Sequence, residues 1–217
     1  GDGGLYAEMV RNRGFEDNRV PEDCTDDAEA FISPSGYRLE KGDQAVPLAG
    51  WKLVEHNARA GVLLETDTPL NAQAPTSARV VVESIGEDGW AGLENGGFWG
   101  MHVKPGGRYA LSLHARGEGV ALTAFLASRD GKRRYDTQVL GVTSPEWRRF
   151  EAVFSVTEKD AEAVLVLCTD RPGTFSLDMV SLFPEDTYLN RKNGLRPDLA
   201  GMIAALKPAF IRFPGGC

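Results

Sequence analysis

The sequence predicts a mainly β protein, with an antiparallel jelly-roll β-sandwich over residues 35–183. Three observations lead to this fold class. Short runs alternate apolar and polar residues, Gly, Pro, Asp and Asn residues separate these runs, and hydrophobic residues make up 42% of the chain. Each alternating run can bury one face of a strand, so a series of them fits two antiparallel sheets on a common core.

The predicted strands differ in how much of their surface they bury. In "YALSLHAR" (109–116) and "RFEAVFSV" (149–156), apolar residues take every second position, as expected of strands with one solvated face. Four other runs are almost continuously apolar and therefore predict central strands: "ARVVVESI" (78–85), "VALTAFLAS" (120–128), "EAVLVLCT" (162–169) and "TFSLDMVSLF" (174–183). With the remaining short runs, about eight strands are expected in the sandwich.

The N-terminal residues 1–34 differ from the sandwich in composition and are predicted to be a separate segment. The stretch "LYAEMVRNR" (5–13) predicts a helical turn. The acidic stretch that follows, residues 16–31, predicts an extended connecting strap without regular elements. An alternative boundary places the start of the sandwich near residue 12.

The C-terminal residues 184–217 change from a strand period to a helix period. Apolar residues recur at helical spacing from Leu195 to Leu206, Pro197 suits the first turn of a helix, and Pro208 ends it. The run "AFIRF" (209–213) then predicts a short strand. A helix followed by a strand is half of an α/β unit, which is foreign to a sandwich.

Charge and hydrophobicity argue against two classes of partner, nucleic acids and membranes. The chain has 24 basic and 31 acidic residues, a net charge of −7, and one short basic block at residues 132–134, so no nucleic-acid partner is expected. No apolar run approaches the ~18 residues that span a bilayer, so no membrane partner is expected either. Uncharged partners such as sugars are not disfavoured. The sequence begins with Gly-Asp-Gly-Gly, which suggests a removed leader or a start within a larger protein.

The usual catalytic and metal-binding patterns are missing from the sequence. The histidines, His56, His102 and His114, have no neighbour at metal-ligand spacing, and no nucleophile elbow or phosphate-binding loop is found. The cysteines are Cys24, Cys168 and Cys217. A disulfide between Cys24 and Cys168 is one reading of them, and free buried thiols are the favoured one.

One aromatic, glycine-rich stretch does suggest binding: "DGWAGLENGGFWGMHV" (88–103). Glycines let loops approach a ligand closely, and an aromatic ring offers an apolar platform for the C–H face of a sugar. Trp90 and Trp99 are therefore carbohydrate-binding candidates, although core packing is the favoured alternative for Trp99. Arg134 and Tyr135, just beyond the turn "RDGK" (129–132), are further cleft candidates.

The remaining two tryptophans, Trp51 and Trp147, each lie at a strand start after a turn. Both are expected to pack in the core or at its rim.

Both ends of the chain resemble one enzyme family. The stretches "GGLYAEMVRNRGFE" (3–16) and "NGLRPDLAGMIAALKPAFIRFPGGC" (193–217) closely resemble the start of the catalytic region of α-L-arabinofuranosidases of glycoside hydrolase family 51. The sandwich between them resembles a family 4/9 carbohydrate-binding module, with a galactose-binding-like fold. "NRGFE" (12–16), "GFWGMHV" (97–103) and "FSLDMVSLF" (175–183) carry that second resemblance.

The resemblance implies an exo-acting, retaining enzyme that removes terminal arabinofuranosyl groups. Its catalytic domain is a (β/α)8 barrel of ~250 residues with two glutamates, an acid/base associated with a Gly-Asn-Glu motif and a nucleophile. This chain contains no Asn-Glu dipeptide. It would thus hold only the first helix and second strand of a truncated barrel, lack both catalytic glutamates and the rest of its catalytic domain, and be inactive by itself.

The resemblance also assigns remnants of the substrate pocket, at the ends of the first two barrel strands: Gly3, Gly4, Leu5, Gly215, Gly216 and Cys217. Modules of this type often hold a structural calcium ion, for which Asp178 and Glu16 are the best matches. No other cofactor is implied.

The implied partners are plant-cell-wall polysaccharides, arabinoxylan and arabinan, and the implied location is secreted or periplasmic. The alternative function is a non-catalytic scaffold that packs on the barrel without binding sugar.

Overall fold

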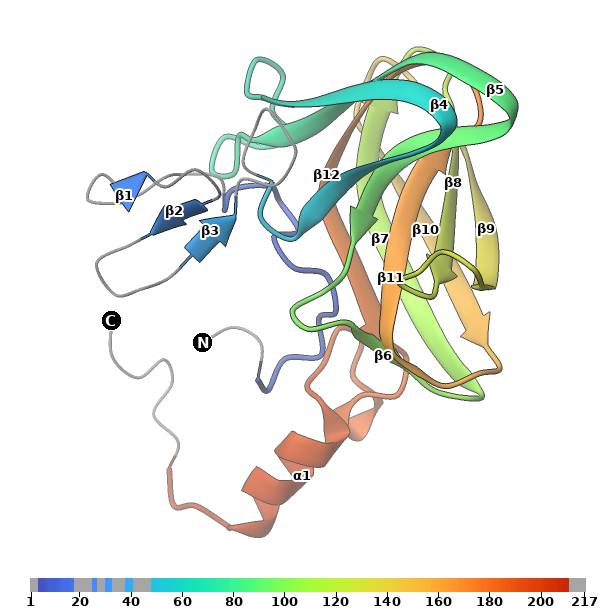
Figure 1. The fold of residues 1–217 in the computed structure, drawn as a ribbon. Coiled ribbons are helices and arrows are strands. Elements are labelled where there is room, and N and C mark those ends of the chain that lie inside the picture. Colours follow the sequence, from blue (N-terminus) through green and yellow to red (C-terminus); the bar gives the residue numbers. More distant parts are fainter. Residues whose placement is uncertain (1–3, 18–24, 27–29, 33–37, 41–47, 211–217) are drawn as a thin grey trace.

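The computed structural model describes residues 4–17, 25–26, 30–32, 38–40 and 48–210. These residues form a β-sandwich, a small separate sheet and a C-terminal helix (Figure 1). The small sheet is antiparallel and consists of β1 (Thr25–Asp26), β2 (Ala30–Ile32) and β3 (Arg38–Glu40). The expectation of a strap without regular elements over residues 16–31 is therefore wrong, since β1 and the first two residues of β2 lie within it.

Nine strands build the sandwich, one more than the sequence predicts. They are β4 (Trp51–Glu65), β5 (Ser77–Asn95), β6 (Met101–Val103), β7 (Gly107–Gly117), β8 (Ala121–Ala127), β9 (Arg134–Val142), β10 (Arg148–Val156), β11 (Asp160–Thr169) and β12 (Gly173–Pro184). All of their pairings are antiparallel, which confirms the predicted fold class.

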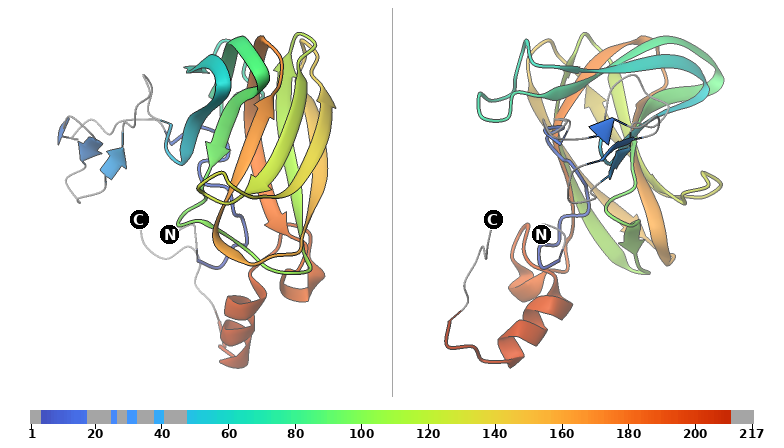
Figure 2. Two further views of the ribbon diagram at one scale, coloured as in Figure 1. Left: turned by 45° about the vertical axis from the view of Figure 1, so that its right-hand side comes forward. Right: turned by 60° about the vertical axis from the view of Figure 1, so that its left-hand side comes forward.

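The long antiparallel pair β4–β5 belongs to both layers of the sandwich. Residues 78–82 of β5 pair with β12, whereas residues 91–95 pair with β11. We call the layer β10-β7-β12-β5-β4 sheet I and the layer β4-β5-β11-β8-β9 sheet II. Figure 2 shows β4 and β5 curving from one layer into the other.

Local chemistry explains where this pair bends. The β4–β5 register shifts between His56 and Ala58, and Asn57 has a positive φ of 45°. The side chain of Asn57 donates a hydrogen bond to the Glu87 carbonyl (2.7 Å). A Cβ on Gly89 would lie 2.4 Å from the Asn57 carbonyl oxygen, so only glycine allows the two strands to approach this closely.

The core lies between the two sheets and follows the predicted alternation. Residues from sheet I such as Leu111 and Phe154 meet residues from sheet II such as Leu126 and Leu165, all of them buried. Two patterns noted in the sequence, 109–115 and 150–156, contribute their apolar face here.

The N-terminal segment also contributes to the core. Phe15 is fully buried and stacks on Trp51, with ring centroids 5.0 Å apart, and the Trp51 ring N–H donates to the Asn12 carbonyl (2.9 Å). Trp51 is thus a core residue, as expected. The predicted helical turn at 5–13 is wrong: Tyr6 forms an antiparallel bridge with Leu195 instead.

The C-terminal helix begins where the sequence predicts. Helix α1 (Pro197–Ala205) has its proline in the first turn and follows a short 3-10 turn, η1 (Tyr188–Asn190). Figure 1 shows α1 extending away from the sandwich. No helix within the described ranges is long and apolar enough to cross a bilayer. The predicted strand 209–213 lies mostly outside the described residues; Ala209 and Phe210, which are described, have no strand structure.

Candidate functional site

The outer face of sheet II carries a second apolar cluster. On β8 and β11 the side chains that alternate with the core residues are also buried, although they point away from the core. We call this cluster the sheet II patch: Val54, Trp90, Phe125, Ala127, Val164, Val166 and Cys168. A sheet with apolar side chains on both faces is expected where the sequence of its strands is almost continuously apolar.

Trp90 and Arg134 meet at this patch. The guanidinium of Arg134 lies 4.1 Å from the centroid of the Phe125 ring and 5.5 Å from that of Trp90. His56 stacks on Trp90 (5.8 Å, 18° between planes), and Phe125 meets the edge of Trp90 (5.2 Å, 89°). The result is a cation over an aromatic pair, an arrangement stabilised by the ring quadrupoles.

Charged side chains border the sheet II patch. Lys52 and Glu94 are cross-strand partners in β4 and β5. Burial raises the pKa of the Glu94 carboxyl, and the positive charges of Lys52 and Arg129 partly offset that rise. An apolar ring surface with hydrogen-bonding groups at its edge has the two kinds of contact that a sugar requires.

Sequence reasoning missed His56 and Phe125 as members of this site. Phe125 left a signal, because it occupies the second face of an almost continuously apolar strand. His56 left none, since its contact with Trp90 depends on the register between β4 and β5.

Tyr135 and Trp99, the other two aromatic candidates, lie elsewhere. Tyr135 packs against the core, and its hydroxyl donates to Asp160 (2.6 Å); burial and this carboxylate raise the pKa of Tyr135 to about 12. Trp99 is 86% exposed, so the interpretation that it fills the core is wrong. It lines a cavity of about 600 Å³ with residues such as Tyr6 and Arg196.

The described pocket remnants lie close to the C-terminal segment. The Leu5 carbonyl accepts a hydrogen bond from the Arg196 N–H (2.9 Å), and the next residue, Tyr6, pairs with Leu195. Gly4 is exposed, with open space where a Cβ would be. The other members of the predicted set lie outside the described residues: Gly3, Gly215, Gly216 and Cys217.

The predicted calcium ligands are close but do not complete a site. Asp178 is fully buried, and its Oδ2 has no hydrogen-bond partner in the described part of the chain. Both oxygens of Glu16 already accept hydrogen bonds from Thr76 (2.8 and 2.9 Å). Calcium takes six to eight oxygen ligands. No group of three His, Cys, Asp or Glu residues in the described ranges could hold a metal ion, so Asp178 and Glu16 would need backbone carbonyls as further ligands, and the calcium site stays a prediction.

Cys168 is a free thiol in the sheet II patch, as the favoured reading of the sequence expects. Cys24, its partner in the alternative disulfide reading, lies outside the described residues. Burial raises the pKa of the Cys168 thiol to about 12.

Since the thiolate is the reactive form, iodoacetamide at pH 8 should leave Cys168 unmodified in the native protein and alkylate it in guanidinium chloride. Peptide mapping by mass spectrometry distinguishes alkylated from unmodified Cys168. Rapid alkylation of the native protein would contradict a buried thiol with a raised pKa.

Known α-L-arabinofuranosidases are similar to this chain over its whole length. No family model matches the sequence. Over 100% of this chain, an extracellular exo-α-L-arabinofuranosidase from Streptomyces chartreusis is 35% identical, and α-L-arabinofuranosidase 1 from Arabidopsis thaliana is 31% identical. The chain spans only 22% and 29% of the length of these two proteins.

A solved structure gives the same result. The arabinose-bound GH51 α-L-arabinofuranosidase MgGH51 matches all of this chain with a TM-score of 0.76 and 30% sequence identity, and this chain covers 32% of that protein. The resemblance in sequence thus extends to the three-dimensional arrangement of the sandwich and its flanks. By sequence and by fold, the whole of this chain matches a part of the α-L-arabinofuranosidases of glycoside hydrolase family 51.

Proposed function

We propose that this chain is the carbohydrate-binding part of an exo-acting α-L-arabinofuranosidase that removes arabinofuranosyl groups from arabinoxylan or arabinan. The observation that carries the binding role is the meeting of Trp90, His56 and Arg134 on the outer face of sheet II. An aromatic ring there can stack on a sugar, and the neighbouring cation and imidazole can bind its hydroxyls. Because the Streptomyces relative is named as extracellular, we further propose that the protein is exported.

A scaffold role is the second candidate, and a specific observation favours it. His56 and Arg134 both lie against the ring of Trp90, which is only partly exposed, so part of its surface is already covered. On this reading the sandwich packs on the remainder of the enzyme and binds no polysaccharide.

Trp90→Ala should weaken retention by immobilised arabinoxylan or arabinan at least about tenfold, because it removes the stacking surface, a contact of roughly 1.4 kcal/mol. Affinity gel electrophoresis of the 217-residue chain measures this retention. Trp99→Ala is the matched control, since it removes the same ring from a different surface and should leave migration in the polysaccharide gel unchanged.

Two results would decide against the binding proposal. Unretarded migration of the unmodified chain in both polysaccharides would favour the scaffold role. Loss of retention in Trp99→Ala but not in Trp90→Ala would move the binding surface to the cavity beside Tyr6.

A further inference from the structure

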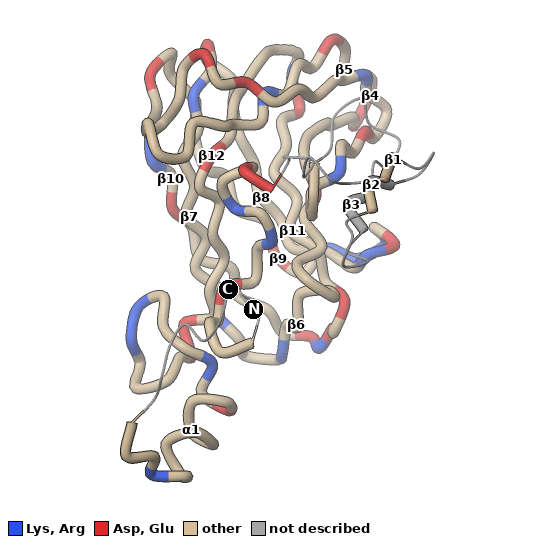
Figure 3. Tube along the Cα trace, turned by 90° about the vertical axis from the view of Figure 1, so that its left-hand side faces the viewer, with Lys and Arg blue, Asp and Glu red and all other residues tan. Residues whose placement is uncertain are grey.

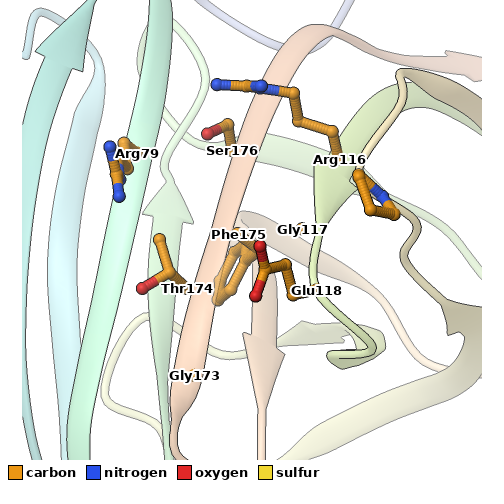
Figure 4. Close-up of a pocket in the computed structure, with 9 residues that line it drawn as sticks. Arg79, Arg116, Gly117, Glu118, Gly173, Thr174, Phe175 and Ser176 are labelled. Atoms are coloured by element: carbon orange, nitrogen blue, oxygen red, sulfur yellow. The ribbon is translucent and has the colours of Figure 1, made fainter.

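The outer face of sheet I carries a second pocket, unrelated to the sheet II patch. Its cavity of about 480 Å³ is lined chiefly by side chains of β5, β7 and β12, and this volume is in the ~300–1,000 Å³ range of small-molecule sites. The polar and charged side chains that line the pocket are Arg79, Arg116, Glu118, Thr174 and Ser176. Figure 4 shows Arg79 and Arg116 on either side of Ser176, with Thr174 and Glu118 below them.

Strand register explains why these side chains meet. Ser176 of β12 pairs with Arg79 of β5 on one side and with Arg116 of β7 on the other, so the three form one row across sheet I. Directly opposite residues in neighbouring antiparallel strands have their side chains within contact distance.

A buried carboxylate lies behind this row. Glu65 is 7% exposed, and its Oε1 accepts hydrogen bonds from Ser176 (2.6 Å) and Arg116 (3.2 Å). The Arg79 guanidinium lies 3.5 Å from Glu65 Oε2. One carboxylate thus holds two guanidinium groups, and the Nε of Arg116 is buried without a hydrogen-bond partner among the described residues.

Fold stability alone does not account for this arrangement. Burying charges is costly, and one arginine would suffice to compensate Glu65. The second arginine leaves one positive charge in excess at this end of the pocket, while the carboxylate of Glu118 lies at the other end. Trp147 helps to hold Arg116 in place, because the Arg116 guanidinium lies 5.6 Å from the centroid of the Trp147 ring. The ring N–H of Trp147 donates a hydrogen bond to the Thr68 carbonyl (2.9 Å). Trp147 is partly buried and lies against Arg116, one of the residues that line the pocket.

The opposite end of the pocket has different chemistry. Glu118 and Thr174 offer a carboxylate and a hydroxyl, both suited to sugar hydroxyl groups. A ligand that satisfies both ends carries an anionic carboxylate at one end and hydroxyls at the other. Guanidinium groups bind carboxylates through paired, charge-assisted hydrogen bonds.

We propose that this pocket binds a hexuronic acid residue, with its carboxylate at Arg79 and Arg116 and its ring hydroxyls at Glu118 and Thr174. The site is separate from the sheet II patch, so it can fail or succeed independently of the proposed function. It would let the module recognise an acidic sugar unit while the sheet II patch contacts neutral ones.

NMR titration of the 217-residue chain with D-glucuronate tests the proposal. The indole N–H resonance of Trp147, assigned with Trp147→Phe, reports on the pocket. A saturable shift is expected with D-glucuronate, with at least tenfold weaker responses to D-glucose, which lacks the carboxylate, and to acetate, which lacks the hydroxyls. Equal binding of D-glucose or acetate, or no saturable shift with D-glucuronate, would overturn the proposal.

Arg79→Gln should weaken D-glucuronate binding at least tenfold, because it removes one charge-assisted hydrogen-bond donor from a half-exposed position. Arg79→Lys keeps the charge but not the planar fork, so intermediate binding is expected. Arg59→Gln is the matched control: it also removes an arginine of β4–β5 that pairs with a carboxylate, Glu83, outside the pocket. Full binding by Arg79→Gln, or equal loss in Arg59→Gln, would contradict the assignment.

Discussion

Phe15→Ala is expected to lower the free energy of unfolding by about 3–5 kcal/mol, the usual cost of removing a buried phenylalanine. Phe15 is fully buried, and its ring stacks on Trp51 at the start of β4. The substitution leaves a cavity where the N-terminal segment enters the core. Chemical denaturation followed by circular dichroism measures the change.

The matched control for this prediction is Phe210→Ala. Phe210 is 83% exposed, so the same side-chain truncation there should change the free energy of unfolding by less than about 0.5 kcal/mol. Similar effects of the two substitutions would show that Phe15 does not anchor the N-terminal segment in the sandwich.

Asp178→Asn should stabilise the protein, and its advantage should grow by about 2–3 kcal/mol from pH 5 to pH 8. Burial raises the pKa of Asp178 to about 7, and the nearby Glu16 carboxylate adds to the effect, while Arg13 opposes it. The folded protein therefore binds a proton that the unfolded chain releases near pH 4. As the pH rises through this interval, the wild-type protein loses stability, whereas the neutral asparagine does not.

Thermal unfolding in EDTA at several pH values tests this prediction. The Asp178 Oδ1 accepts a hydrogen bond from the Met179 N–H (2.6 Å), which the asparagine oxygen can also accept. A stability difference that is constant from pH 5 to pH 8 would contradict the raised pKa. Repeating the measurement with CaCl2 tests the calcium prediction as well, since bound calcium would raise the melting temperature of the wild type and not of Asp178→Asn.

The strands could be predicted from the sequence because their pattern is local. Alternation in 109–116 and 149–156 records which face each strand buries, and β7 and β10 follow it. The bend of β4 and β5 could not be predicted in this way. It depends on the approach of Asn57 to Gly89, residues 32 positions apart in the chain whose contact is fixed by strand register.

The candidate site was predictable only in part, for the same reason. Residue type suggested Trp90 and Arg134, and their strands bring them to one surface. Tyr135, the very next residue, points to the other face of β9, as alternation along a strand requires. Trp99 was misread because a glycine-rich loop leaves no periodic pattern from which burial can be inferred.

The polar pocket of sheet I left no signal in the sequence at all. Arg79, Arg116 and Ser176 come from three strands that are far apart in the chain, and only the pairing of those strands makes them neighbours. Charge is otherwise interspersed along the molecule: Figure 3 shows acidic and basic residues scattered over the trace, with neither sign gathered on one side. The pocket is therefore a local feature that overall composition does not reveal.

The shared hairpin β4–β5 has a consequence for how the module opens. A single pair of strands completes both layers of this sandwich, because β5 pairs with β12 in sheet I and with β11 in sheet II. Separating either sheet strains the same bend at Asn57. The two layers should therefore act as one cooperative unit in hydrogen exchange, with core amides of both becoming accessible only when the whole sandwich unfolds.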